Sequence, residues 1–346
     1  MIATRFMELR KRRGLMIALV LVNIGLPTIF LAVRLVAHAV APKSYGPAGG
    51  YDIFTNLVAG VMYVFGFIVA ATLGCAAGSV DLTEGMFRHL VVTGRSRLAI
   101  YLARIPAGLA IVVPLVAVGF TIVCTVCVAA APTKLDYQGV TLPAGLSRSG
   151  FLAWAGDHPV EVLCDLPGPV PGNLPCPGPN GGGVPSGTPG EPSPAVLKSL
   201  AIQNAARIYP GYAATFLSPS NSLMIYSGLW IELEAVIGFI VGLGLGSLMG
   251  QRTVPVVLMI VLELILTPIF STAVIAHLIN FQRGVVGLAM AHLEPGGLPL
   301  AFGGDNRGTG ISHLVPESTA VAVVVILAWL VGWTALGAWR MMTRDT

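Results

Sequence analysis

Residues Asp81 to Pro106 read DLTEGMFRHLVVTGRSRLAIYLARIP and form a charged stretch between two long apolar stretches. From Leu82 onward the apolar side chains recur at helical spacing, whereas Thr83, Glu84 and Arg88 fall mostly on the opposite side. This pattern predicts a short amphipathic helix. Its apolar positions are Leu82, Met86, Phe87, Leu90 and Val91.

The same stretch predicts how the chain is threaded through a membrane. It holds four of the 20 basic residues, and Arg95, Arg97 and Arg104 follow the predicted helix. Basic residues in short loops are retained on the cytoplasmic side, so this connection is predicted to be cytoplasmic.

The composition of the whole chain is that of a polytopic membrane protein. Of its 346 residues 55% are hydrophobic and only 10% are charged, whereas soluble globular proteins carry about 25% charged residues. The net charge of +4 reports orientation in the membrane and gives no indication of nucleic-acid binding. The basic start leads into a span with no small-residue cleavage site, which predicts that no signal peptide is removed.

Apolar runs long enough to cross a hydrocarbon core of ~30 Å, which needs about 20 helical residues, occur six times. The predicted spans are Leu15–Val40, Ile53–Val80, Leu98–Ala131, Leu223–Met249, Val254–Ile279 and Thr319–Trp339. The predicted fold class is an all-α polytopic membrane protein with six transmembrane helices, an N-terminal interfacial helix and a long outer loop.

The basic residues predict the orientation of these spans. Twelve of the 20 Lys and Arg residues fall in short segments on one side, seven fall in the longer segments on the other, and Arg34 lies inside a span. This bias places both termini in the cytoplasm and the protein in the cell membrane. Arg34 is close to the outer end of its span, where its side chain reaches the headgroups.

This orientation divides the chain into six segments. They are a cytoplasmic interfacial helix at 1–13, spans one to three with the cytoplasmic loop 81–97 at 14–131, an extracytoplasmic Pro/Gly-rich loop at 132–222, spans four and five at 223–279, an extracytoplasmic re-entrant segment at 280–318, and span six with a cytoplasmic tail at 319–346. The helix at 1–13 has two open interpretations, because it suits either packing near the cytoplasmic loop or simple anchoring by its basic residues.

Three groups of residues in and after the cytoplasmic loop carry a resemblance to a known family. They are Glu84-Gly85-Met86-Phe87-Arg88, the run from Leu90 to Arg97, and Leu102-Ala103-Arg104. They resemble the first cytoplasmic loop of ABC transporter permeases of the type-2 exporter class, in which a Glu-x-Gly-Thr-x-Arg element precedes Leu-Leu, a Pro-Val-Ser-Arg-like turn and Leu-Ala-Lys. Here Met86 replaces the Thr, Gly94-Arg95 replaces the Pro-Val and Arg104 replaces the Lys, a variant similar to actinobacterial members.

The resemblance implies a permease subunit of an ATP-driven exporter. By that resemblance a second copy or a homologous permease and cytoplasmic ATP-binding cassette subunits complete the transporter, and the ATPases push on the cytoplasmic loop. The residues implied to couple the loop to the ATPase subunit are of two kinds. Met86, Phe87 and Leu90 would make apolar contacts with it, and Glu84, Arg88, Arg95 and Arg97 would make polar contacts. Without the resemblance, the loop is interpreted as a solvated connection with anchoring arginines.

The sequence offers no enzyme chemistry of its own. A phosphate-binding loop needs a Lys after a Gly, and none of the four lysines follows a Gly, so ATP and Mg are expected in the partner subunit and no cofactor in this chain. No His-Glu-x-x-His pattern occurs, and Cys124 and Cys127 are interpreted as core cysteines. His277, His292 and His313 lack ligand spacing, so no metal site is predicted.

Acidic residues inside spans are the remaining candidates for a functional site. Glu263 is expected near mid-bilayer, where a carboxylate marks either the translocation path or a paired structural residue, and Pro268 is expected to kink the same helix. Glu232 and Glu234 are expected near the outer boundary, as solvated acids in preference to gating or interface residues.

The outer segments carry further expectations. Between Cys164 and Pro194 more than half of the residues are Pro or Gly, so no packed core is expected there, and Cys164 and Cys176 are predicted to form a disulfide, with two free thiols as the alternative. A helix is predicted from Ala195 to Ile208 and is expected to stop at Tyr209-Pro210-Gly211. The segment 280–318 suits either short re-entrant helices, as the resemblance implies, or an ordinary loop with one surface helix.

The fourth span has glycines at strict four-residue spacing, which permits close approach of another backbone. They are Gly238, Gly242, Gly246 and Gly250. The sequence leaves open whether the other helix belongs to the same chain or to a second copy, and packing within the chain is favoured.

Two other function classes stay open. A secondary transporter would use Glu263 as an ion relay, and a membrane sensor or scaffold would use the long outer loop.

Overall fold

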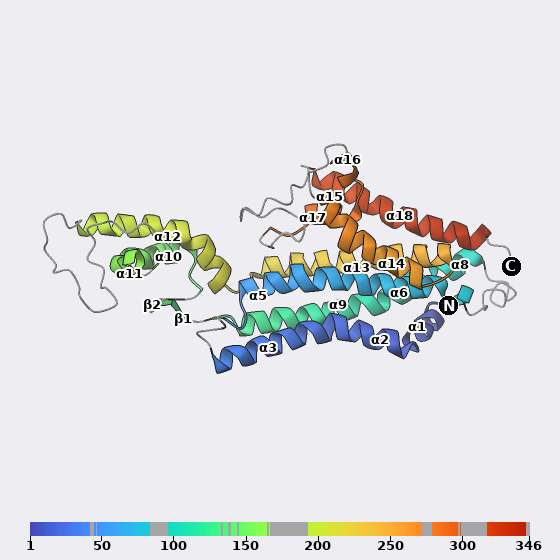
Figure 1. Cartoon of the computed structure of the whole chain (residues 1–346), viewed down its shortest axis with the longest axis horizontal. Helices are drawn as coiled ribbons and strands as arrows, with labels where there is room; N and C mark the ends of the chain where they lie inside the picture. Colours follow the sequence, from blue (N-terminus) through green and yellow to red (C-terminus); the bar gives the residue numbers. More distant parts are fainter. Residues whose placement is uncertain are drawn as a thin grey trace. The chain divides into compact units, whose positions relative to one another are not determined.

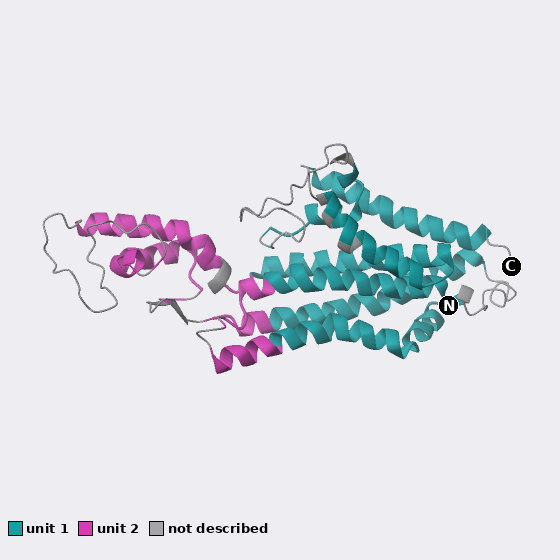
Figure 2. Ribbon diagram, in the orientation of Figure 1, with its two compact units in different colours: residues 1–31, 55–125, 220–346 teal, residues 32–54, 126–219 magenta. Residues whose placement is uncertain are grey.

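The computed structural model of the chain describes most of its residues. They are 1–41, 45, 47–83, 96–132, 134–137, 140–143, 145–164, 166, 193–271, 279–296, 298 and 317–343. They form helices and one two-stranded hairpin. The chain divides into two compact units (Figure 2), which are unit 1 (Met1–Leu31, Thr55–Thr125 and Ser220–Thr346) and unit 2 (Ala32–Phe54 and Val126–Pro219).

The α-helices and strands follow one another along the chain as labelled in Figure 1, and η denotes the π-helical turns that occur among them. Up to the third predicted span they are α1 (Ile2–Arg10), α2 (Arg13–Val20), η1 (Leu21–Gly25), α3 (Leu26–Val40), α5 (Tyr51–Asn56), η2 (Leu57–Met62), α6 (Tyr63–Thr83), α8 (Arg97–Leu102) and α9 (Arg104–Ala129). After it come β1 (Lys134–Tyr137), β2 (Val140–Pro143), α10 (Arg148–Asp157), α11 (Pro159–Cys164), α12 (Pro194–Phe216), α13 (Asn221–Met249), α14 (Thr253–Val261), η3 (Leu262–Leu266), α15 (Thr267–Ser271), α16 (Ile279–Gln282), α17 (Val286–His292) and α18 (Thr319–Thr343).

Five helices among the described residues are long and apolar enough to cross a membrane, which fits a helical polytopic membrane protein. They are Arg13–Val40, Tyr51–Asp81, Arg97–Ala129, Asn221–Met249 and Thr319–Thr343. The remaining predicted span, Val254–Ile279, begins as the helical run from α14 through η3 to α15, and residues 272–278 lie outside the described part. The total of six spans therefore stays a prediction.

The centre of unit 1 is the contact between α6 and α13, which lie side by side (Figure 1). A Cβ atom at Gly238 would meet Phe67 O at 2.8 Å, and one at Gly246 would meet Cys75 O at 2.5 Å. Both distances are shorter than any relaxed Cβ contact, so the two backbones approach as closely as glycine alone permits. The glycines of α13 thus pack against a helix of the same chain.

The glycine contact is reciprocal, which the sequence analysis missed. On α6, a Cβ at Gly74 or Gly78 would collide with the backbone of α13. Gly250, the last of the four predicted glycines, has a role in ending the helix. It ends α13 with φ 67°, in the left-handed region that glycine adopts without strain.

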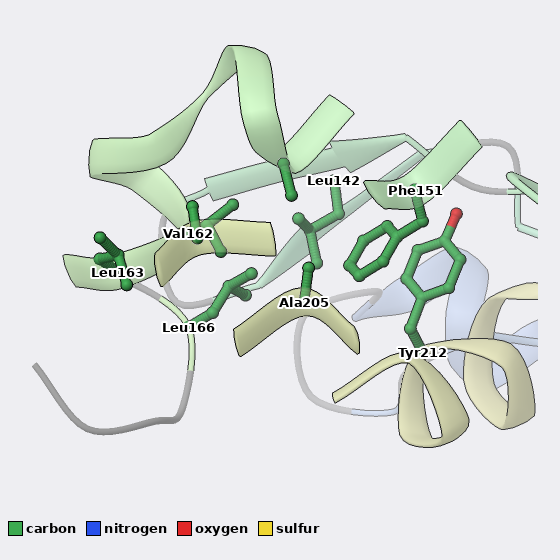
Figure 3. Packing of buried hydrophobic residues seen from close by; sticks show 9 residues of the cluster. Leu142, Phe151, Val162, Leu163, Leu166, Ala205 and Tyr212 are labelled. Carbon is green, nitrogen blue, oxygen red and sulfur yellow. The ribbon is translucent and has the colours of Figure 1, made fainter. Parts of the chain in front are cut away.

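Unit 2 contains a small hydrophobic core built by the hairpin and by helices α10, α11 and α12. Phe151 stacks on Tyr212 with ring centroids 4.2 Å apart, and the Tyr212 hydroxyl donates a hydrogen bond to Pro143 O at 2.5 Å. Figure 3 shows the cluster, whose labelled members are Leu142, Phe151, Val162, Leu163, Leu166, Ala205 and Tyr212. The predicted outer loop 132–222 therefore includes a packed helical unit, whereas its Pro/Gly-rich part, 167–192, lies outside the described residues.

The predicted end of the helix in this unit is wrong. Helix α12 continues through Pro210 to Phe216. The rings of Tyr209 and Tyr212 both lie against Phe151, at 5.9 Å and 4.2 Å, so tertiary packing of this turn outweighs the hydrogen bond that proline removes.

The glycine contact leads to a test with a matched control. Gly242→Ala places a methyl group against the backbone of Ala71, and we expect it to destabilise the protein by ~1–3 kcal/mol through overpacking. Gly332→Ala in α18 adds the same methyl where no atom lies within 4 Å, and is expected to be neutral or to stabilise by up to about 1 kcal/mol through helix propensity. Thermal unfolding in detergent measures both, and equal melting temperatures would contradict the close contact.

Candidate functional site

The structure describes both ends of the predicted coupling segment. Residues Glu84, Met86, Phe87, Arg88, Leu90 and Arg95 lie outside the described part of the chain. At the C-terminal end, Ser96 caps α8 by accepting a hydrogen bond from the amide of Ala99 at 3.2 Å. Arg97 donates a hydrogen bond from Nη1 to the carbonyl of Met342 at 3.0 Å, so this arginine ties α8 to the last turn of α18.

At the other end, Asp81 is the centre of a buried ion cluster, which we call the Asp81 cluster (Arg5, Glu8, Asp81 and Arg104). Arg5 donates from Nη1 to Asp81 Oδ1 and from Nη2 to Asp81 Oδ2, both at 2.7 Å, and Arg104 donates to Asp81 Oδ2. Asp81 is 0% exposed, Arg104 2% and Arg5 8%. Asp81 thus lies inside the protein in the last turn of α6, and the amphipathic helix predicted from Leu82 lies from Glu84 onward outside the described residues.

The Asp81 cluster is neutral as a whole. Arg5 also pairs with Glu8 at 2.7 Å, so two carboxylates face two guanidinium groups. Burial on its own lowers the pKa of Arg5, but the hydrogen bonds and charge of Asp81, followed by those of Glu8, raise it above its usual value. Arg5 therefore stays charged, and the cluster depends on all its members because each unpaired buried charge is costly.

The cluster joins three helices at one end of unit 1, and the neighbouring carbonyl of Gly78 connects it to a fourth. Arg5 belongs to α1, Asp81 to α6 and Arg104 to α9. The carbonyl of Gly78 accepts hydrogen bonds from Arg104 Nη1 at 3.0 Å and from Ser247 Oγ on α13 at 3.4 Å. Because Asp81 and Arg104 flank residues 82–103, their ion pair holds the two ends of that segment together.

A second group of polar residues surrounds helix α17, where the re-entrant segment was predicted. Residues 286–291 of α17 are buried within the chain, so α17 itself is not a surface helix, and the re-entrant course of the segment 280–318 stays a prediction. The carbonyl of Met290 accepts a hydrogen bond from Trp230 Nε1 at 2.9 Å, and the ring of Trp230 stacks on Tyr63 at 4.4 Å.

Carboxylates next to α17 are buried too. Both carboxylate oxygens of Glu294 are buried and have no hydrogen-bond partner among the described residues, and burial raises the pKa of this group to about 8. His292 Nε2 lies 3.8 Å from Glu317 Oε2. The Asp/Glu/His/Cys residues of the described part form no group of three able to hold a metal ion.

The acidic residues of the spans differ from their predicted settings. Glu234 is 1% exposed and the carboxylate oxygens of Glu232 are buried, so the expectation of solvated acids is wrong. The backbone of Glu263 lies in the π-helical turn η3. Its side chain is not among those that the structure describes, so the role of Glu263 stays a prediction.

The cysteines fall into two groups. Cys75, Cys124 and Cys127 are not disulfide-bonded in the described part of the chain. Cys164 at the end of α11 is disulfide-bonded, whereas its predicted partner, Cys176, lies outside the described residues. The specific pairing of the two stays a prediction.

Comparison of the chain with protein-family models, with curated proteins and with solved structures yields no match in any of the three. The resemblance of the cytoplasmic loop to exporter permeases therefore rests on its residue pattern. Function has to be argued from the geometry just described and from the residue types that build it.

The buried pairing of Asp81 leads to a stability test. Asp81→Asn keeps the size of the side chain but takes the paired carboxylate from Arg104 and leaves Arg5 with Glu8 alone, and we expect a loss of ~3–5 kcal/mol in the free energy of unfolding. The control is Asp157→Asn, which removes a carboxylate 70% exposed and paired with Lys198 at 3.5 Å, and which should cost about 1 kcal/mol or less. Chemical or thermal unfolding in detergent compares them, and similar losses would contradict the buried cluster.

Glu294 leads to a test of pH dependence. Its raised pKa means that the folded protein binds a proton more tightly than the unfolded chain, so its contribution to stability is full below about pH 4.5 and is lost as the pH rises to about 8. Glu294→Gln should flatten the decline in melting temperature between pH 5 and pH 8. His292 and Glu317 are present in both proteins, so the difference between the two curves isolates Glu294. The exposed Glu161→Gln is the control, and parallel curves for wild type and Glu294→Gln would contradict the assignment.

Proposed function

We propose that this protein is the membrane-spanning permease subunit of an ATP-driven exporter, with residues 81–97 as the segment that receives force from a separate ATPase subunit. The observation that carries the proposal is the Asp81 cluster. It fixes Asp81, at the start of this segment, to helix α1 and to Arg104, which follows the end of the segment, through buried charges.

The cluster suits force transmission because its buried charges have few other partners with which to pair, which keeps the cluster rigid. A displacement of the segment acts on Asp81 and Arg104, and through them on the ends of α6 and α9. Gly78 then passes the displacement to α13, because its carbonyl binds Arg104 and Ser247 and its backbone lies against α13. A packed interface of this kind moves as a body and does not deform continuously.

The proposed topology has six spans, both termini in the cytoplasm and location in the cell membrane. The end of unit 1 that holds the Asp81 cluster carries the basic residues Arg10 to Arg13, which favours the cytoplasmic side. The loop 132–222 is then extracytoplasmic, which suits the disulfide at Cys164.

Two kinds of partner complete the proposal. An ATP-binding cassette subunit binds the segment through Met86, Phe87 and Leu90 together with Glu84, Arg88 and Arg95, and it supplies the ATP and Mg chemistry. A second permease copy, or a homologous permease, packs on the lipid-facing helices. In the most apolar stretches of the first and last spans only 22% and 17% of residues are buried within the chain, against 78% in α13, which leaves those two spans free for lipid and partner contacts.

Buried acids favour one alternative function. Glu232 lies in an apolar helix with buried carboxylate oxygens that have no partner among the described residues, which is a setting typical of ion relays in carriers. A secondary transporter of this kind would accumulate substrate from an ion gradient as the purified chain alone, without any ATPase.

The proposed coupling is tested with the chain and an ATP-binding cassette protein from the same organism, reconstituted together in nanodiscs. We expect the chain to stimulate the ATPase severalfold and the variant Phe87→Ala/Arg88→Ala to lose most of this stimulation, because it lacks both the apolar and the charged contact. Phosphate release measures the effect.

The control variant is Ser149→Ala, which changes an exposed residue of unit 2 and should leave the stimulation unchanged. Undiminished stimulation in the double variant would contradict the coupling role. Labelling of a cysteine at position 95 by an impermeant maleimide from outside intact cells would contradict the topology itself.

A further inference from the structure

A cavity of about 590 Å³ lies in unit 1 between α2 and α14, on the side of α6. Both α2 and α14 pack on α6, and the cavity separates their first turns. Its walls are apolar, with Leu15 and Ala18 of α2 facing Val256 and Val257 of α14.

The cavity is strongly basic at one end. Arg12 and Arg13 at the start of α2 and Arg252 at the start of α14 line it, and no acidic side chain is among the described residues that do so. Arg13 and Arg252 are exposed at this edge. The exposed guanidinium groups of Arg13 and Arg252 above an apolar wall are complementary to a molecule with an anionic head and an apolar tail.

Both helices also begin at this edge of the cavity. Helix α2 starts at Arg13 and α14 at Thr253, and neither has a hydrogen bond from the side chain that precedes its first turn. The amides of a first helical turn have no partner within the helix and carry partial positive charge. They add to the arginines and favour a phosphate group at the same place.

We infer that this cavity binds an anionic phospholipid, with its headgroup phosphate between Arg13 and Arg252, near Arg12, and one acyl chain along Leu15, Ala18 and Val257. Guanidinium groups bind phosphate oxygens through paired hydrogen bonds, and basic pockets between membrane helices are suited to anionic headgroups. The apolar wall favours a lipid over a free phosphate, which would leave that wall in contact with water.

Bound lipid would connect two parts of unit 1. It bridges α2 and α14, which meet the cavity from opposite sides. Helix α2 follows α1 after only Lys11 and Arg12, and α1 contributes Arg5 to the Asp81 cluster. An anionic lipid therefore holds the α1–α2 junction in place beside the cluster, and the lipid composition of the inner leaflet sets how firmly α1 is held.

The test measures lipid binding by the full chain. Purified protein in detergent is titrated with phosphatidylglycerol, phosphatidylcholine or glycerol 3-phosphate, and bound ligand is read by native mass spectrometry. We expect phosphatidylglycerol to bind at least about tenfold more tightly than the other two. The variant Arg13→Gln/Arg252→Gln should lose most of this preference, by about tenfold or more for two phosphate contacts.

A matched control separates a defined site from general attraction to positive charge. Arg10→Gln/Lys11→Gln removes the same charge from the same end of the unit without touching the cavity, and should stay within about twofold of wild type. Circular dichroism verifies folding, and Arg252→Gln alone, at an exposed turn, replaces the double variant if that does not fold.

Three outcomes would overturn the inference: equal binding of phosphatidylglycerol and phosphatidylcholine, equal losses in the two double variants, or binding of glycerol 3-phosphate as tight as that of the lipid. The assay contains no ATPase, so its result is independent of the proposed coupling.

Discussion

A carboxylate without access to water is the constraint on which unit 1 depends. Asp81 ends an apolar helix inside the protein, and its charge is tolerated only because Arg5 and Arg104 approach it from two other helices. The pairing fixes where α1 lies against α6, and where α9 begins. Residues 82–103 therefore start and finish at one place, whatever their own conformation.

Close packing by glycine is the second constraint, and it meets the first at Gly78. The glycines of α6 and α13 bring the two backbones into contact, and this leaves the carbonyl of Gly78 within reach of both Arg104 and Ser247. A larger side chain at this level would separate the helices and move the carbonyl away from the arginine. The ion cluster and the helix interface thus depend on one another.

The arginines at this end of unit 1 have two different roles, which depend on whether the side chain is buried or exposed. Arg5 and Arg104 are buried and neutralised by carboxylates, so they hold helices together. Arg13 and Arg252 are exposed above an apolar cavity that no described acidic residue lines, so they are suited to a ligand from the membrane. One member of each group, Arg5 and Arg13, lies near the other along the chain, separated by the rest of α1 and its junction with α2, which makes α1 the element that both groups affect.

The sequence by itself determined the apolar helices, the helical start and the glycine spacing of α13, because these depend on composition and periodicity within one segment. The sequence did contain one indication of a buried ion pair, because Asp81 and Arg104 are charged residues that lie beside or inside apolar spans. Only the tertiary structure decided its partners, since Arg5 and Asp81 are 76 residues apart. It likewise decided the burial of Glu234, the passage of α12 through Pro210 and the cavity between α2 and α14, because each results from contacts between distant segments and not from the local pattern of residues.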